Sequence, residues 1–286
     1  MSEAGVIHDI GYQRYTGPRL GRGAAFGALY QHGLRAAFGL GRSAKAKIFP
    51  WLVISVMLLV AVILAAIRSQ TGQNLVDYFE YDDSMSWLII FFVAILAPEL
   101  VSRDLRSGTL PLYFSRPLRA VDYVAAKVAA TVTALWLLMG VPQLIMFLGA
   151  AFTTKDGAKG VWNEFLDLLP GWGYSLLWAA LFAAIGLLVA SLTGKRAFAA
   201  GGIVAVFLMT TPVVGVLSVL PSSTTNHLAF LASPMTLIQG VGVWLRDNHE
   251  TIDLGRFGPI YGIEAVCLIT ACLLLLLARY RKVASL

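Results

Sequence analysis

Long apolar runs separated by short polar segments dominate the chain. A helix needs roughly 20 mostly apolar residues, each adding about 1.5 Å, to cross about 30 Å of hydrocarbon. Six runs meet this requirement, although the second is the shortest and contains Pro98 and Glu99. The pattern predicts an all-α polytopic membrane protein with about six transmembrane helices. These helices are expected over residues 48–67, 87–101, 123–152, 172–192, 197–220 and 260–280.

The composition indicates that a lipid bilayer is the solvent. Hydrophobic residues make up 58% of the 286 residues and charged residues only 13%, which is about half the charged share of soluble domains. A formal net charge of +6 also raises the question of nucleic-acid binding. The basic residues, however, lie in short segments between apolar runs and not along one face of a folded domain. We therefore expect the bilayer, and no nucleic acid, as a partner.

The distribution of Lys and Arg predicts the orientation, because these residues in short loops favour the cytoplasm. With six spans both termini lie on one side, which collects 17 of the 22 Lys and Arg residues. Seven of them lie in residues 1–47, five in 102–127, two in the turn after the fourth run and three near the C-terminus. This predicts a cytoplasmic N-terminus, a cytoplasmic tail at 282–286 and a large external loop at 221–259.

The segment before the first span has a helical pattern of its own. Phe26, Leu29, Tyr30, Leu34 and Phe38 recur at spacings of mostly three and four residues, which is typical of one face of an amphipathic helix. Basic residues on the rest of the segment favour an interfacial helix on the inner leaflet. The alternative is a basic flank of the first span, because four glycines lower the helix propensity.

The large external loop contains a second apolar segment, at residues 229–245. It is interrupted by Pro234 and two glycines, so it is not expected to cross the membrane alone. We interpret it as a re-entrant or surface-lying helical segment. A seventh span here is the alternative, but it would place the basic C-terminal tail outside the cell.

No motif for catalysis is present in the sequence. An ATP site would show a glycine loop ending in Lys and Ser or Thr, and residues 192–198 lack the leading glycine of such a loop. The zinc motif H-E-x-x-H does not occur either. We therefore expect no catalytic, cofactor or metal site on this chain. An intramembrane enzyme, the rival interpretation, would need polar groups that converge at one depth, and those of this chain are scattered.

The loop at residues 102–122, between the second and third spans, has the densest mixture of charged and apolar residues. Such a mixture suits a short amphipathic helix in a protein groove, because apolar side chains bury area and charges fix the register. The simpler alternative is a loop at the inner leaflet whose arginines contact lipid phosphates.

The residues of this loop carry a resemblance to a known family. Asp104 and Arg106 precede the run Ser107 to Leu110, and Ser115 to Leu118 follow it. This order, in a six-span chain, resembles the permease subunits of ABC-2 type transporters, or type V exporters. Residues 11–22 also resemble the start of a bacterial subgroup. Arg106 and Pro111 depart from the family, which often has acidic or polar residues at these two positions.

The resemblance implies a cytoplasmic coupling helix that docks on a separate ATP-binding subunit, which would hold ATP and Mg. It also implies a connecting helix at the N-terminus, a second permease subunit, identical or related, and a place in the bacterial plasma membrane. The coupling positions that we infer from it are Arg103, Asp104, Arg106, Gly108, Thr109, Leu110, Tyr113, Arg116 and Pro117.

The implied function is alternating-access export of a hydrophobic or amphipathic molecule, peptide or lipid. A membrane assembly or sensor protein that never transports is the alternative. Glu99 either binds a cationic cargo or pairs with Arg103 four residues on, and we favour the pair because an unpaired buried carboxylate is costly. A cargo path at the implied dimer interface is expected to involve Glu99, Phe91, Phe92, Phe207, Met209, Thr210 and Thr211.

Overall fold

The computed structural model describes residues 17, 21–41, 43–108, 113, 118–246 and 254–284. Within these residues the chain is helical and contains no strand, which confirms the all-α class. The helices are α1 (Arg22–Ala37), α2 (Ala44–Thr71), α3 (Tyr78–Ser84), α4 (Ser86–Leu100), α5 (Ser102–Arg106), α7 (Ala120–Thr153), α8 (Gly157–Ser191), α9 (Arg196–Leu208), α10 (Thr211–Ser218), α11 (Ser223–Leu228), η1 (Ala229–Ala232), α12 (Pro234–Arg246), η2 (Gly255–Phe257) and α13 (Gly258–Ala284).

Five helical stretches are long and apolar enough to cross a membrane, namely those of α2, α7, α8, α9 with α10, and α13. Two further pairs pass the same test together but are bent, by 60° between α3 and α4 and by 118° between α11–η1 and α12. The described chain therefore offers five to seven candidate spans, in agreement with a polytopic membrane protein.

Helical structure begins well before two of the predicted spans, and the fifth predicted span, residues 197–220, is divided into α9 and α10. The fourth predicted span begins at residue 172, whereas α8 begins at Gly157. Polar residues such as Glu164 interrupt an apolar run, but they do not end a helix. The second predicted span corresponds to α4, and a short helix, α3, precedes it directly. A capping box begins α3, since Asp77 Oδ1 accepts from Glu80 N at 2.7 Å and Glu80 Oε2 accepts from Asp77 N at 3.2 Å.

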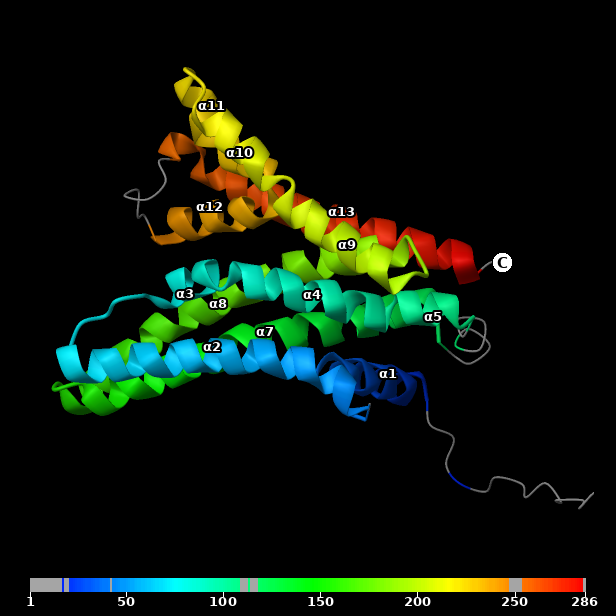
Figure 1. The fold of residues 1–286 in the computed structure, drawn as a ribbon, viewed down its shortest axis with the longest axis horizontal. Coiled ribbons are helices and arrows are strands. Elements are labelled where there is room, and N and C mark those ends of the chain that lie inside the picture. The colour runs from blue at the N-terminus through cyan, green and yellow to red at the C-terminus, as the bar shows by residue number, and fades with distance from the viewer. Residues whose placement is uncertain are drawn as a thin grey trace, which may run out of the picture.

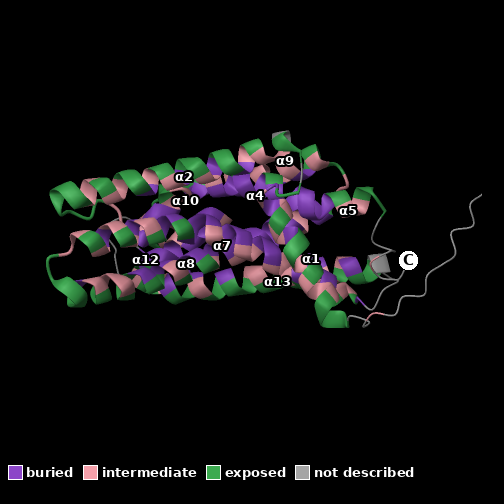
Figure 2. Ribbon diagram, turned by 90° about the horizontal axis from the view of Figure 1, so that it is seen from below, coloured by how far each residue is buried: buried purple, intermediate pink, exposed green. Residues whose placement is uncertain are grey.

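The long helices run roughly along one axis of the molecule (Figure 1). We call the end that contains α1, α5 and the C-terminal part of α13 the basic end, and the end with α3 and Arg246 the acidic end. Helix α8 is central. In its most apolar stretch of 18 residues 67% of the residues are buried, compared with 17% in the corresponding stretch of α9 with α10. Figure 2 shows buried residues concentrated on α4 and α7 and exposed residues along the outer helices.

Helix α1 is present where the sequence predicts an amphipathic helix, but its buried stripe contacts protein. Leu29 and Gly33 are buried, and Tyr30 donates to Thr133 Oγ1 on α7 at 3.2 Å. A Cβ added at Gly33 would lie 2.9 Å from the Cβ of Ala130. The glycine that lowers helix propensity thus allows α1 to pack closely on α7.

The apolar segment at 229–245 forms a hairpin and not a straight span. The chain turns between η1 and α12 at Ser233, whose hydroxyl lies 2.9 Å from Thr210 Oγ1. Both α11 and the C-terminal end of α12 lie towards the left of Figure 1, which favours a re-entrant hairpin. The two glycines lie within α12 and do not break it. A Cβ at Gly240 would lie 2.4 Å from Tyr261, and one at Gly242 would lie 2.8 Å from Tyr174. They serve close packing instead.

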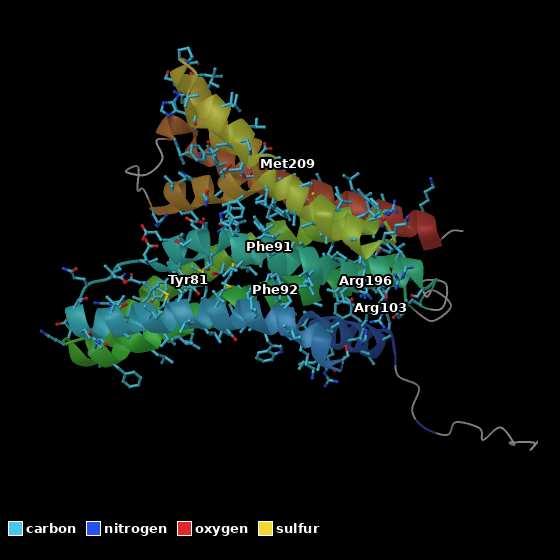
Figure 3. The ribbon with its side chains drawn as sticks, viewed as in Figure 1. Tyr81, Phe91, Phe92, Arg103, Arg196 and Met209 are labelled. Atoms are coloured by element: carbon cyan, nitrogen blue, oxygen red, sulfur yellow. The ribbon has the colours of Figure 1, made fainter. Side chains whose placement is uncertain are left out.

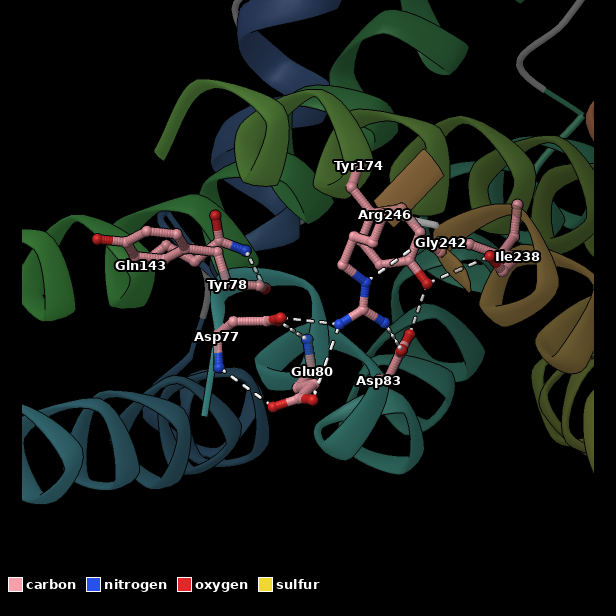
Figure 4. Close-up of polar contacts among 9 residues, drawn as sticks. All are labelled: Asp77, Tyr78, Glu80, Asp83, Gln143, Tyr174, Ile238, Gly242 and Arg246. Atoms are coloured by element: carbon pink, nitrogen blue, oxygen red, sulfur yellow. Dashed lines mark hydrogen bonds and ion pairs between the residues drawn. The ribbon is translucent and has the colours of Figure 1, made fainter. Parts of the chain in front are cut away.

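Arg246, at the end of α12, ties this hairpin to α3 (Figure 4). Its Nη1 lies 2.8 Å from Asp77 Oδ2 and 3.8 Å from Glu80 Oε1, and its Nη2 lies 4.0 Å from Asp83 Oδ2. The guanidinium also lies over the ring of Phe79, at 5.1 Å from the centroid. One arginine therefore neutralises part of a cluster of three carboxylates that come from α3 and its N-cap residue, Asp77.

Candidate coupling site

The predicted coupling loop starts with α5, a single helical turn that follows α4 after a break at Val101. Gly108 ends this turn with φ at +63°, a left-handed conformation that glycine adopts without the steric cost of a side chain. This explains why a glycine stands at that position. Thr109, Leu110, Arg116 and Pro117 lie outside the described residues, so their coupling role stays a prediction.

Asp104 ties α5 to α7. Its Oδ2 accepts from Lys127 Nζ at 2.8 Å and from the Tyr123 hydroxyl at 2.7 Å. Only 3% of the Lys127 side chain is exposed, so its charge depends on this carboxylate for stabilisation. The Asp104 position that the resemblance selected is thus an anchor within this chain itself.

Tyr113 also faces its own chain. Its ring centroid lies 5.8 Å from that of Tyr123, which in turn lies 4.9 Å from Tyr280 on α13. Burial raises the pKa of the Tyr113 hydroxyl above its ordinary value. Tyr113 therefore joins the loop to Tyr123 of α7, which in turn contacts α13. A side chain that packs against its own chain is a poor probe of a partner surface.

Glu99 forms the ion pair predicted with Arg103, and it has a second partner. Its Oε1 lies 2.9 Å from Arg103 Nη1, and its Oε2 lies 2.9 Å from Arg196 Nη1 at the start of α9. The carboxylate side chain is 8% exposed, whereas those of Arg103 and Arg196 are 53% and 40% exposed. Figure 3 shows the two arginines close to one another at the basic end.

Two further contacts fix the ends of the loop, and a third joins α13 to the same end of α8. Arg22 of α1 binds Asp122 through two hydrogen bonds of 2.6 Å, and this bonding raises the pKa of the guanidinium. Ser102 donates to the carbonyl of Ala190 at 2.7 Å. Arg279 of α13 donates to the carbonyl of Ser191 at 2.6 Å, also at the end of α8. The loop base thus contacts α1, α7 and α8 directly.

The arrangement can transmit a displacement, because the anchors are charged or hydrogen-bonded and partly buried. A force on α5 acts on α7 through Asp104, and it acts on α9 through Arg103, which binds Glu99 of α4, which binds Arg196. Moving α5 alone would break these pairs and leave Lys127 without its carboxylate, which is costly. The helices are therefore expected to shift together with the loop base.

The expected cargo-path residues differ in their burial and contacts, and their role in a path between two permeases stays a prediction. Phe92 is buried and contacts Phe38, whereas Phe91 is 41% exposed. Phe207 is fully buried and stacks on Phe182 at 4.1 Å between ring centroids, so it packs the core. Met209 is 75% exposed. Thr210 and Thr211 donate to backbone carbonyls at the break between α9 and α10.

We predict that Glu99→Gln lowers the free energy of unfolding by about 1–2 kcal/mol, because two guanidinium groups lose a charged acceptor but remain partly hydrated. Combining it with Arg196→Gln should recover part of the loss. Thermal unfolding of the single and double variants measures this. Strictly additive losses would contradict direct pairing of Glu99 with Arg196.

Comparison with known proteins identifies the family of this chain. Residues 51–251 match the model of the family described as ABC-2 family transporter protein. The match begins within α2, includes the whole loop 102–122 and ends just after α12. A comparison with curated proteins found no match. The chain belongs to the ABC-2 family of transporter proteins and is a membrane component of that class of transporter.

Proposed function

We propose that this chain is the permease subunit of an ATP-driven exporter, and that a cytosolic ATP-binding subunit docks on the loop 102–122. The observation that carries the proposal is the set of charged anchors at the loop base. Asp104 with Lys127 joins the loop to α7, and Arg103 joins it to Glu99 at the end of α4, which in turn binds Arg196 of α9. A loop that only connected two spans would not need buried ion pairs, because such pairs cost desolvation energy.

The proposed cycle uses ATP and Mg on the partner subunit. Closure of two ATP-binding subunits would push on the loops of two permeases, and the anchors would pass this displacement to α7 and α9. Alternating access of a cavity between the permeases would follow. The second permease, identical or related, is expected against α9 and α10, where Met209, Val216 and Val219 are all more than 60% exposed. The complex would lie in the bacterial plasma membrane.

Purification of the full-length chain from native membranes tests the proposal. We expect an ATP-binding subunit and a second permease among the co-purifying chains, identified by mass spectrometry. A stable complex that contains no nucleotide-binding chain would contradict the docking proposal. A complex that contains one but shows no cargo-dependent ATP hydrolysis would instead favour an assembly or sensor role.

We predict that the basic end faces the cytoplasm, from the 17 of 22 Lys and Arg residues on that side of the predicted topology. Single cysteines at Ser43 and Ser107 should resist an impermeant thiol reagent in intact cells, whereas those at Ser84 and Ser222 should react. All four positions are exposed. The background replaces Cys267 and Cys272 with alanine. Labelling of Ser43 or Ser107 without cell lysis would contradict the orientation.

A further inference from the structure

A cavity of about 340 Å³ lies near the basic end, between α1, α2, α4 and α9. Glu99 and Arg196 line it together with Phe49 and Phe92. Its volume falls within the range of roughly 300–1,000 Å³ that is typical of small-molecule sites. The cavity therefore combines charged groups with an apolar wall in a space that can hold part of an amphiphile.

The charged groups of this cavity favour an anion. Both carboxylate oxygens of Glu99 are engaged, one by Arg103 outside the cavity and one by Arg196 in its wall, so the only carboxylate among the described lining residues is already neutralised. The Nε atom of Arg196 is buried and has no hydrogen-bond acceptor among the described residues. A cationic cargo, the alternative use of Glu99, would have to compete with two guanidinium groups.

The start of α9 adds a second, independent preference for negative charge. Arg196 is the first residue of this 13-residue helix. The side chain of the N-cap residue, Lys195, makes no hydrogen bond to the helix backbone. The first N–H groups of a helix lack intrahelical acceptors and carry partial positive charge. Because Arg196, Ala197 and Ala200 all line the cavity, this uncapped helix end lies at its wall.

The remaining wall suits hydrocarbon. Phe49, Phe92 and Leu96 contribute apolar side chains, and Ala36, Ala46 and Ala200 are small enough to leave the space open. Burial of apolar surface contributes about 25 cal/mol per Å², so an acyl chain on this wall would add affinity that a free anion lacks.

We propose that the cavity binds an amphiphile with an anionic headgroup, such as a phosphate on an acyl chain. The headgroup would contact Arg196 and the start of α9, and the chain would lie along Phe49 and Phe92. This inference rests on the proposed function in one respect: the bound amphiphile is cargo only if the chain belongs to an exporter. Binding itself requires no ATP-binding subunit, so the two proposals can fail separately.

Binding of a fluorescent lysophosphatidic acid to the purified full-length permease in neutral detergent tests this inference. A lysophosphatidylcholine with the same acyl chain and label is the reference ligand. We expect Arg196→Gln to weaken lysophosphatidic acid binding about tenfold, the loss of one charge-assisted contact, and to leave lysophosphatidylcholine unchanged. Lys195→Gln is the matched control, because Lys195 is exposed beside Arg196 and does not line the cavity.

A second variant tests the acyl-chain part. Ala200→Phe narrows the cavity and should weaken binding of both lipids, with Arg196 still in place. Equal affinities for the two lipids, or equal effects of Arg196→Gln and Lys195→Gln, would overturn the anionic headgroup. Complete displacement by inorganic phosphate at the concentration of the lipid would show a free-phosphate site and overturn the amphiphile. Co-purification of the ATP-binding subunit with the unaltered permease and with Lys195→Gln tests docking separately from lipid binding, because Lys195 belongs neither to the cavity nor to the anchors of the loop base.

Discussion

Asp104→Ala is expected to lower the free energy of unfolding by about 3–5 kcal/mol, because it leaves the Lys127 ammonium buried without its carboxylate. The physical reason is the environment of Lys127, whose side chain is only 3% exposed and lies 2.8 Å from Asp104 Oδ2. The same change also removes the acceptor of the Tyr123 hydroxyl. Unfolding in mixed detergent micelles, followed by circular dichroism, measures the loss.

Two controls separate this effect from a general sensitivity of the loop. Arg106→Ala removes a charge from the same turn, but Arg106 is exposed, so we expect a change within about 0.5 kcal/mol. Asp104→Ala combined with Lys127→Met removes both charges and should recover most of the stability, since apolar replacement of a buried pair is often neutral. If the double variant is no more stable than Asp104→Ala, the buried charge is not the cause.

Arg246→Gln is expected to lower the free energy of unfolding by about 2–3 kcal/mol, between the values for surface and buried ion pairs. Arg246 is 17% exposed and faces carboxylates that are 20–46% exposed. Its loss leaves Asp77, Glu80 and Asp83 to repel one another at the acidic end. The loss should diminish as the pH falls through about 6, because burial raises the pKa of Asp83 to about 6 and its protonation removes one of the three repelling charges.

Arg256→Gln is the matched control for this prediction. Arg256 belongs to η2, and it is exposed and lies over the ring of Phe257. We expect it to change stability by less than about 0.5 kcal/mol. Equal losses in the two variants would show that Arg246 does not hold α12 to α3.

Interactions local in sequence could be predicted, and distant ones could not. The apolar runs predict the long helices because hydrocarbon thickness fixes the length of a span. Glu99 and Arg103 stand four residues apart, so helical periodicity alone brings them together. Arg196 is far along the chain from Glu99, and only the packing of α9 on α4 makes it a partner. Arg246 and Asp77 likewise depend on the fold of the hairpin around α12.

Two glycines of α12 illustrate why local helix propensity underestimates this helix. Gly240 and Gly242 lower helix propensity, and from the sequence they interrupt the segment 229–245. In the folded chain each faces a tyrosine ring at a distance that no Cβ could tolerate. Tertiary packing therefore outweighs local propensity in α12, and a propensity scale contains no term for that contact.

The central claim, that the loop 102–122 couples this permease to an ATP-binding subunit, is tested most directly with Leu110→Asp in the reconstituted complex. The change places a charge in the predicted docking surface, where desolvation is costly. Leu192→Asp is the control, because Leu192 is 62% exposed at the basic end and outside the loop. Both partner retention and transport-coupled ATP hydrolysis should fall at least about tenfold for Leu110→Asp and remain unchanged for Leu192→Asp. Full retention of both by Leu110→Asp would contradict the account and leave the loop as a lipid-facing connection.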